Sequence, residues 1–478
     1  MVDAHRHAAL SAPSLARTVR RALLVHEEIF DEGDAPLLEL LGAEATIDLV
    51  DGRPVRAVHA DNAATTLVAR RVHDKLEAFW PWYGSAHRGS GLASQVTTEL
   101  LGACRRSVAH FVGARPGDHV VFTRNTTDAL ALLAHALPEN TAIFGFDFEH
   151  HANLLPWRRA ASYRALGVPR SHDELITRLE AALASCTECD RLVAITGASN
   201  VTGELVPLER VVAVARRYGA RVLVDGAQLV PHRAIAIAAL GVDYLVFSGH
   251  KLYAPLGAGV LVGRGDWLDA AAPYLAGGGA VQHVGDGAVS WHTGPARHEG
   301  GTPNVPGALA LAAACEALED VGFKRLVAHE ERLRDALFAG LRRVEGLELL
   351  RIFPGETQGT ATAAFRVRGF SPGLLAAALA AEHGISVRDG AFCAHPLVRA
   401  LVGVDEGGSC GGVPGAVRVS FGAGSRLADV ERLLCALDDL ATRGLRTRYG
   451  AVAGRLAPVH DTRARPVFLR SERAFAAP

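Results

Sequence analysis

The chain has 478 residues, of which 49% are hydrophobic and 21% are charged, a composition typical of a folded protein with a large core. Its length favours two domains over one. The formal net charge of -1 excludes a strongly basic or acidic field, so we expect a small-molecule substrate rather than a nucleic acid.

The sequence shows no signal for secretion or membrane insertion. Its first residues lack the basic flank and apolar run of a signal peptide, and no apolar stretch is long and uncharged enough to span a bilayer. The seven cysteines are odd in number and widely scattered, which argues against a disulfide framework. Cys186 and Cys189 form a lone C-x-x-C pair without a histidine cluster, so no metal site is expected. We expect a cytoplasmic protein.

Composition divides the chain into regions. Residues 1–57 are polar and rich in Ala and Leu, with an apolar patch at Leu38, Leu40 and Leu41, and they predict a helical extension. From 58 to 306, short β-rich runs alternate with Ala/Leu/Arg helical stretches, as in a mostly parallel sheet covered on both faces. The strand-like runs are 119–122, 141–144, 192–195, 221–224 and 244–247.

Residues 307–445 predict a second, smaller α+β unit. A long helical stretch opens it, strands are expected at 361–365 and 417–421, and a final helix is expected at 427–443. Residues 446–478 are rich in Arg, Pro and Ala and have no clear periodicity. They predict either an arm on a partner subunit or a disordered tail.

Polar side chains follow the strand-like runs, at the edge where parallel sheets bind their ligands. Asp225 ends one run, and Lys251 closes the tetrad 248–251 after the next. A lysine amine can form a Schiff base with an aldehyde, and a carboxylate can keep a pyridinium nitrogen protonated. This pair is what a pyridoxal phosphate enzyme needs, although a lone lysine and aspartate are more often a surface residue and a helix cap.

Several hydroxyl and imidazole groups are candidates for binding a phosphate. Thr126 and Thr127 precede an Ala/Leu helix, whose free N–H groups and positive dipole end attract anions, but they also fit an ordinary N-cap. Ser248 and His250 stand beside the candidate lysine and would add donors. Thr302 lies in a Gly/Pro loop that either approaches a phosphate or is a plain turn.

His150, Asn200 and Gln228 follow strand ends as well. The His150 ring could stack on a pyridine, while the adjacent His151 leaves open which ring points inward. A single histidine is more often a surface or core residue. The two amides suit hydrogen bonds to a phenolic oxygen, and amides are also frequent turn residues.

A cysteine and two arginines of the second unit are candidates for substrate chemistry. Cys393 lies in a loop-like segment near Arg388 and His395, where cations would favour a thiolate nucleophile, although most free cysteines are inert and buried. Arg418 lies in a strand and could grip a substrate carboxylate with two hydrogen bonds, or it could be one of many surface arginines.

Taken in order, these motifs resemble those of the class V, fold-type I pyridoxal phosphate enzymes, and within them the SUF-type (group II) cysteine desulfurases and selenocysteine lyases. The resemblance covers about residues 58–443. The matching segments are 61–66, 87–89, 124–127, 149–153, 199–201, 225–228, 248–253, 301–304 and 393–397. It implies an α/β fold, in which a large domain at 58–306 holds a mostly parallel seven-stranded sheet and a smaller α+β domain at 307–445 carries the cysteine loop.

The resemblance also implies how the cofactor is bound. Lys251 would carry it as a Schiff base and move protons, His150 would stack on its ring, and Asp225 would bind the pyridine nitrogen. Gln228 and Asn200 would lie near the phenolic oxygen. The phosphate would be held by Thr126, Thr127, Ser248 and His250, with Thr302 contributed by the other subunit of a homodimer.

For the substrate, the resemblance implies L-cysteine, whose α-carboxylate Arg418 would bind with help from Arg388 and Asn200. Cys393 would attack the substrate sulfur and become a persulfide, releasing L-alanine, and an acceptor protein or a small thiol would then take the sulfur. Residues 1–57 and 446–478 are additions to the family pattern, and the chain also departs from the family in three places in between. Ala391 and Phe392 replace polar residues before the cysteine, the segment 402–416 is an insertion, and 419–425 lacks an expected Asn-Thr.

Two alternatives remain. The chain could be another class V enzyme, namely an aminotransferase, an epimerase or a C–S lyase of secondary metabolism, that keeps Lys251 and acts on a different substrate. It could also be a non-catalytic binding protein on a degenerate scaffold, against which the intact Lys251, Asp225 and His150 argue.

Overall fold

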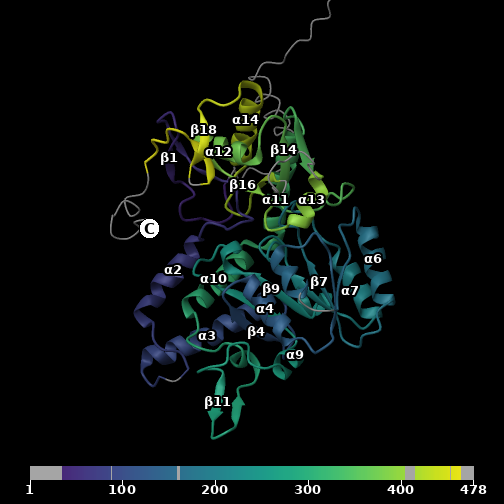
Figure 1. The fold of residues 1–478 in the computed structure, drawn as a ribbon. Coiled ribbons are helices and arrows are strands. Elements are labelled where there is room, and N and C mark those ends of the chain that lie inside the picture. The colour runs from purple at the N-terminus through teal and green to yellow at the C-terminus, as the bar shows by residue number, and fades with distance from the viewer. Residues whose placement is uncertain (1–34, 88, 159–161, 404–414, 453, 465–478) are drawn as a thin grey trace, which may run out of the picture.

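The computed structural model describes residues 35–87, 89–158, 162–403, 415–452 and 454–464. Its largest element is a seven-stranded sheet with the strand order β4-β10-β9-β8-β7-β5-β6 (Figure 1). The strands are β4 (His119–Thr123), β5 (Ala142–Gly145), β6 (Tyr163–Ala165), β7 (Arg191–Thr196), β8 (Arg221–Asp225), β9 (Tyr244–Ser248) and β10 (Gly259–Gly263). Only β10 runs antiparallel to its neighbours, so the expected mostly parallel seven-stranded sheet is confirmed.

Both faces of this sheet are covered by helices, because successive residues of each strand enter two different apolar clusters. In β9, for example, Tyr244 and Val246 belong to one cluster, while Leu245 and Phe247 belong to the other. The first face is covered by α4 (Thr126–Ala136), α5 (Leu155–Arg158) and α9 (Gly265–Ala270). The second face is covered by α3 (Leu92–Phe111), α6 (His172–Ala184), α7 (Leu208–Arg217) and α10 (Val305–Val321).

The helical stretch expected after residue 306 is two helices, because Gly322 takes a φ of +80° and ends α10. The second helix, α11 (Phe323–Leu341), packs with α12 (Pro372–His383) and α14 (Leu427–Arg443) on a four-stranded antiparallel sheet. The strand order of this sheet is β13-β14-β17-β16. Its strands are β13 (Leu347–Leu350), β14 (Thr362–Val367), β16 (Arg388–Gly390) and β17 (Ala416–Ser420). A smaller α+β unit therefore follows the large sheet.

The second core also takes residues from the start of the large region. β3 (Val58–His59) pairs in parallel with β15 (Ile385–Ser386), and Val58 and Ala60 are buried in the second core. The remaining elements are α2 (Arg70–Phe79), α8 (Ile237–Leu240), α13 (His395–Val402) and the hairpin of β11 (Val281–Val284) with β12 (Val289–Trp291). Among the described residues no helix is long and apolar enough to cross a membrane.

The helix expected over 1–57 is wrong for the described part of that region. β1 (Thr46–Asp48) and β2 (Pro54–Arg56) form an antiparallel hairpin instead. Gly52 closes the turn with a φ of +81°, and the Asp51 carboxylate accepts a hydrogen bond from the Arg53 backbone N–H. The turn-forming residues decided the local structure here, although the region is rich in Ala and Leu. Residues 1–34 lie outside the described residues.

Part of the C-terminal region is folded on its own chain, which corrects the prediction of an arm or a disordered tail. β18 (Tyr449–Val452) and β19 (Arg455–Pro458) form a hairpin against α12. The Tyr449 hydroxyl donates to Glu382 of α12 at 2.9 Å. Most of the predicted insertion, 404–414, and the last residues, 465–478, lie outside the described residues.

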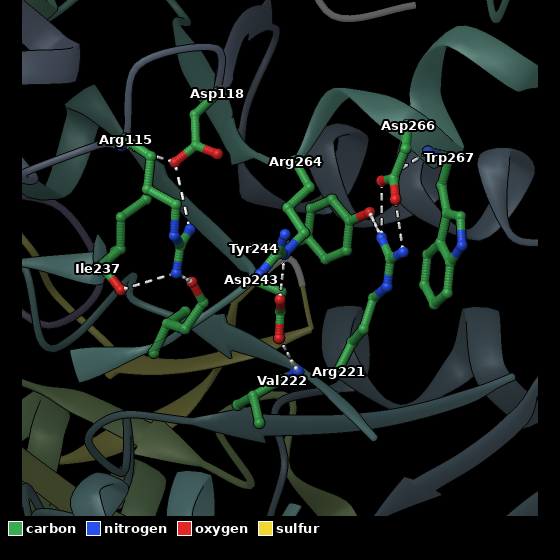
Figure 2. A network of polar contacts seen from close by, with 11 residues as sticks. Arg115, Asp118, Arg221, Val222, Ile237, Asp243, Tyr244, Arg264, Asp266 and Trp267 are labelled. Carbon is green, nitrogen blue, oxygen red and sulfur yellow. Dashed lines mark hydrogen bonds and ion pairs between the residues drawn. The ribbon is translucent and has the colours of Figure 1, made fainter. Parts of the chain in front are cut away.

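A network of polar contacts closes one end of the large sheet (Figure 2). Arg221, at the start of β8, makes two hydrogen bonds to Asp266 at 2.7 and 2.6 Å and lies 3.8 Å from the centre of the Trp267 ring. Asp243 accepts a hydrogen bond from the Val222 backbone N–H at 2.9 Å. This end is structural, and the opposite ends of the same strands open into a cavity.

Candidate active site

A cavity of about 490 Å³ lies at the carboxyl ends of β7, β8 and β9, where the two sheets meet. Twelve of the thirteen predicted site residues line it: Thr126, Thr127, His150, Asn200, Asp225, Gln228, Ser248, His250, Lys251, Arg388, Cys393 and Arg418. The exception is Thr302, which is exposed outside this cavity. Since Thr302 is expected to act on a partner subunit, its role stays a prediction.

Lys251 and Asp225 form the charged centre of the cavity. Lys251 ends a 3-10 helix, Gly249–Lys251, that follows β9 directly, and Asp225 is the last residue of β8. Burial lowers the pKa of the Lys251 amine, and the nearby Asp225 carboxylate opposes that shift. Burial likewise raises the pKa of Asp225, which accepts one hydrogen bond from the Ala227 N–H at 3.0 Å. The charge of each group therefore favours the ionised form of the other.

The segment 61–66 holds the lysine turn in place. The carbonyl of His250 accepts hydrogen bonds from the Thr65 hydroxyl at 2.9 Å and from the Thr66 hydroxyl at 3.2 Å. The Gln228 side-chain N–H donates to the Ala63 carbonyl at 2.7 Å. The sequence motif at 61–66 had pointed to this segment without giving it a task, because its partners lie more than 160 residues away.

One corner of the cavity offers unused hydrogen-bond donors. The Thr126 and Ser248 hydroxyls are buried, and neither has a hydrogen-bond partner in the described part of the chain. Thr126 is also the first residue of α4, where backbone N–H groups lack helical acceptors. Burial and the neighbouring Lys251 lower the pKa of His250 to about 4, so its ring is neutral at physiological pH. These groups suit a bound phosphate.

His150 faces the cavity, whereas His151 is not among its lining residues, and this settles which ring points inward. The Nδ1 atom of His150 accepts a hydrogen bond from the Ala152 N–H at 3.0 Å, so the neutral ring carries its proton on Nε2. Burial, followed by the charge of Lys251, lowers the pKa of His150 to about 4.

Glu149 was not predicted as a site residue, and it links the segment after β5 to the end of β7. Its carboxyl group is buried and accepts hydrogen bonds from the Asn153 side chain at 2.7 Å and from the Thr196 N–H at 2.9 Å. Asn153 in turn accepts from the Trp157 indole N–H. Burial raises the pKa of Glu149 well above its ordinary value. Its place beside His150 in the 149–153 motif was the available signal.

Arg418 is the buried cation of the cavity wall. Its guanidinium donates to the Asn200 carbonyl at 2.8 Å and to the Asp61 carboxylate at 2.9 Å, while its Nε atom has no partner among the described residues. Arg388 stands opposite Arg418 in the register of β16 and β17. Two guanidinium groups on neighbouring strands repel each other unless an anion lies between them, so this wall suits a carboxylate.

Cys393 is exposed on a turn with an unusual backbone. Phe392 and Cys393 take φ values of +52° and +54°, a region that costs a non-glycine residue about 1–2 kcal/mol. The Asn200 side chain donates to the Phe392 carbonyl at 2.8 Å, and the backbone N–H of His151 donates to the Cys393 carbonyl at 2.7 Å. These bonds keep the thiol at the cavity edge despite the strain.

Comparisons with known proteins agree with this architecture. The family model of aminotransferase class-V matches residues 58–433. A probable cysteine desulfurase of Pseudomonas aeruginosa is 38% identical over 387 residues, which are 80% of this chain and 92% of that protein. A cysteine desulfurase of Synechococcus elongatus is 35% identical over 404 residues, which are 83% of this chain but only 62% of that longer protein.

The fold is also that of solved relatives. The crystal structure of the cysteine desulfurase CsdA from Escherichia coli superimposes with a TM-score of 0.70 at 31% identity, covering 81% of this chain and 95% of that one. The resemblance stated from the sequence motifs is thereby confirmed. Because the family model spans most of the chain, the chain belongs to the aminotransferase class-V family, among relatives that are named cysteine desulfurases.

Proposed function

We propose that this chain is a pyridoxal phosphate-dependent cysteine desulfurase, which converts L-cysteine to L-alanine and keeps the sulfur as a persulfide on Cys393. The observation that carries the proposal is the meeting of Lys251, Arg418 and Cys393 in one cavity, although they come from different elements. The names of the relatives support the same reaction.

The residues of the cavity fit pyridoxal phosphate. The hydroxyls of Thr126 and Ser248, which have no partner among the described residues, lie at the start of α4 and the end of β9 and would bind its phosphate with Thr127 and His250. Asp225 would bind the pyridine nitrogen, the His150 ring would lie against the cofactor ring, and Lys251 would hold it covalently. When bound, the cofactor would supply an acceptor for the electrons released at the substrate α-carbon.

Proton transfer falls to Lys251. Its lowered pKa favours a neutral Nζ atom that can take a proton from the substrate and return it later. His150 cannot act as a strong base at Nδ1, because that atom already accepts the Ala152 N–H. The carboxylate of the substrate would lie against Arg418 and Arg388. The Nε–H of Arg418, which meets no acceptor within the described part of the chain, offers a donor for it.

The sulfur step requires the Cys393 thiolate. Its Sγ atom attacks the substrate sulfur, an S–S bond forms, and the C–S bond breaks with its electron pair passing to the substrate β-carbon, which then takes a proton. The products are L-alanine and a Cys393 persulfide. A thiol of an acceptor protein or of a small molecule then removes the outer sulfur. Selenocysteine would react by the same steps.

Replacing the nucleophile tests the proposal. Cys393→Ser should reduce alanine and persulfide formation from L-cysteine by about a hundredfold or more, while the absorbance of bound pyridoxal phosphate stays unchanged. Cys435→Ser, which alters another exposed thiol on α14, is the matched control and should behave like the wild type. Undiminished alanine formation by Cys393→Ser would contradict the desulfurase mechanism.

The substitution of Ala391 and Phe392 for the family's polar residues favours one alternative, a different class V reaction on the same scaffold. Product analysis separates the two, because pyruvate and ammonia indicate a C–S lyase, whereas alanine and sulfide indicate a desulfurase. No turnover of L-cysteine would point to an aminotransferase or an epimerase with another amine substrate.

We also propose that the protein is a cytoplasmic homodimer. The exposed position of Thr302, outside the cavity of its own chain, supports its use in the cavity of a partner subunit. Light scattering should give twice the mass of the chain, and Thr302→Ala should weaken cofactor binding without changing that mass.

A further inference from the structure

The turn that carries Cys393 is held from several sides. Within the turn, the Ala394 N–H donates to the Ala391 carbonyl at 2.8 Å. From outside, the Asn200 side chain donates a hydrogen bond to the Phe392 carbonyl, and the backbone N–H of His151 donates one to the Cys393 carbonyl at 2.7 Å. Because φ is positive at two successive non-glycine residues, the chain would leave this conformation if these bonds were lost.

His151 contributes a second bond, and this one depends on its protonation. The backbone N–H of His395, just after the turn, donates to Nε2 of His151 at 3.2 Å. Nε2 can accept only while it is unprotonated, so the neutral ring carries its proton on Nδ1. The His395 ring packs edge-on against His151, with 4.5 Å between the ring centres. Cys393 and His395, on the C-terminal side of the turn, therefore both bind His151.

The surroundings of His151 disfavour its protonated form. The charged or titratable groups that act on it are His150, with ring centres 6.4 Å apart, together with His395 and Arg158. Arg158 is itself paired with Asp147 at 3.0 Å. Burial, then His395 and Arg158, lower the pKa of His151 below its ordinary value.

We propose that His151 is a positioning residue for Cys393. Its unprotonated Nε2 atom accepts the His395 N–H directly after the Phe392–Cys393 turn, and this bond, which we call the latch, is lost on protonation so that the turn loosens. The proposal rests on the proposed function, since it concerns how the nucleophile is presented. The sign is fixed by the geometry. A histidine with a lowered pKa stays neutral at physiological pH, and the latch opens as the pH falls below about 6.5 towards the pKa of His151.

Two substitutions of His151 distinguish the contribution of its acceptor atom from that of its ring. In His151→Gln the amide oxygen can take the place of Nε2 as an acceptor but does not titrate. In His151→Phe the ring is kept and the acceptor is lost. His110→Gln, which alters an exposed histidine of α3 far from the turn, is the matched control.

Hydrogen exchange of the peptide 391–397, measured by mass spectrometry in the cofactor-loaded protein and corrected for intrinsic rates, reads the latch directly. Wild type and His110→Gln should lose about five- to tenfold protection from about pH 7.5 to about pH 4.5. His151→Gln should stay protected at both pH values, and His151→Phe should show at both pH values the lower protection that the wild type shows at about pH 4.5. Equal protection in His151→Phe and wild type at neutral pH would overturn the proposal, as would an acid loss that His151→Gln shares.

Activity gives an independent second measurement. The kcat for alanine formation should fall with pH more steeply in the wild type than in His151→Gln, while KM for L-cysteine changes little, because Arg418 is untouched. If no variant forms alanine, the proposed function fails, and hydrogen exchange still decides whether the latch exists.

Discussion

Burial sets the properties of the cavity residues. Lys251 and Asp225 shift their pKa values in opposite directions, because each is removed from water and burial disfavours the charged form of both. The charge of each residue opposes the shift of the other. His150 and His250 are kept neutral by the same loss of solvent. The buried hydroxyls of Thr126 and Ser248 find no hydrogen-bond partner in the described ranges, which is unfavourable, and a ligand that accepts hydrogen bonds from them would remove that cost.

Ser248→Ala tests this last point at one atom. Loss of the hydroxyl should weaken pyridoxal phosphate binding by about ten- to a hundredfold, because a hydrogen bond to a charged phosphate is lost. The cofactor-free protein should lose no stability, since that hydroxyl has no partner in the described residues. Reconstitution titrations and urea unfolding measure the two effects. The control is Ser185→Ala, an exposed serine at the end of α6, and lower stability with unchanged affinity would contradict the assignment.

The two ends of the strands in the large sheet have different roles. One end carries a stabilising polar network, and the other end carries residues of the cavity. β8 begins at Arg221 in the polar network of Figure 2 and ends at Asp225 in the cavity. The same strand therefore carries a stabilising residue, Arg221, and a residue of the cavity, Asp225, four positions apart. Arg221 combines two hydrogen bonds with a stacked indole, an arrangement that only a planar guanidinium can make.

Arg221→Lys should lower the free energy of unfolding by about 1 kcal/mol, because the charge is kept while the bidentate bond and the stacking on Trp267 are lost. Urea unfolding of the cofactor-free protein measures the change. Arg217→Lys, in a more exposed pair with Glu180, should change the value by less than about 0.5 kcal/mol. Cofactor affinity should be unaffected in both variants, and an equal effect at the two positions would refute the special role of Arg221.

At the scale of the whole molecule, the two sheets are joined by buried polar contacts as well as by the cavity. Glu204, in the turn after β7, accepts hydrogen bonds from Arg351 at 2.8 Å and from the Ile352 N–H at 2.7 Å. Asp61 reaches Arg418 of the second sheet. The position of Arg418 relative to Lys251 therefore depends on contacts between parts of the chain that are far apart in sequence.

Glu204→Ala should destabilise the protein by about 3 kcal/mol, because it leaves the half-buried Arg351 cation and two backbone N–H groups without their acceptor. Thermal or urea unfolding measures the loss, and hydrogen exchange should rise around residues 350–354. Glu348→Ala, an exposed residue of the adjoining β13, should stay within about 0.5 kcal/mol of the wild type. A similar small effect for Glu204→Ala would show that the two sheets do not depend on this contact.

The sequence by itself determined the alternation of strands and helices and the polar residues at the strand ends. Both are local patterns, since a buried parallel strand reads as an apolar run and its ligands follow it directly. Lys251, Asp225 and Thr126 could be found in this way. Local composition failed where turn chemistry decided the outcome, as at Gly52 in the hairpin that replaced an expected helix.

Only the tertiary structure decided how these residues meet. The pairing of Asp61 with Arg418 and the clamp of Thr65 on His250 join positions 357 and 185 residues apart, and no periodicity records them. The backbone of the Cys393 turn is strained, so its conformation follows from His151 and Asn200 rather than from its own residues. The tertiary structure also decides the protonation states, because a group loses its contact with water only once distant segments have packed around it.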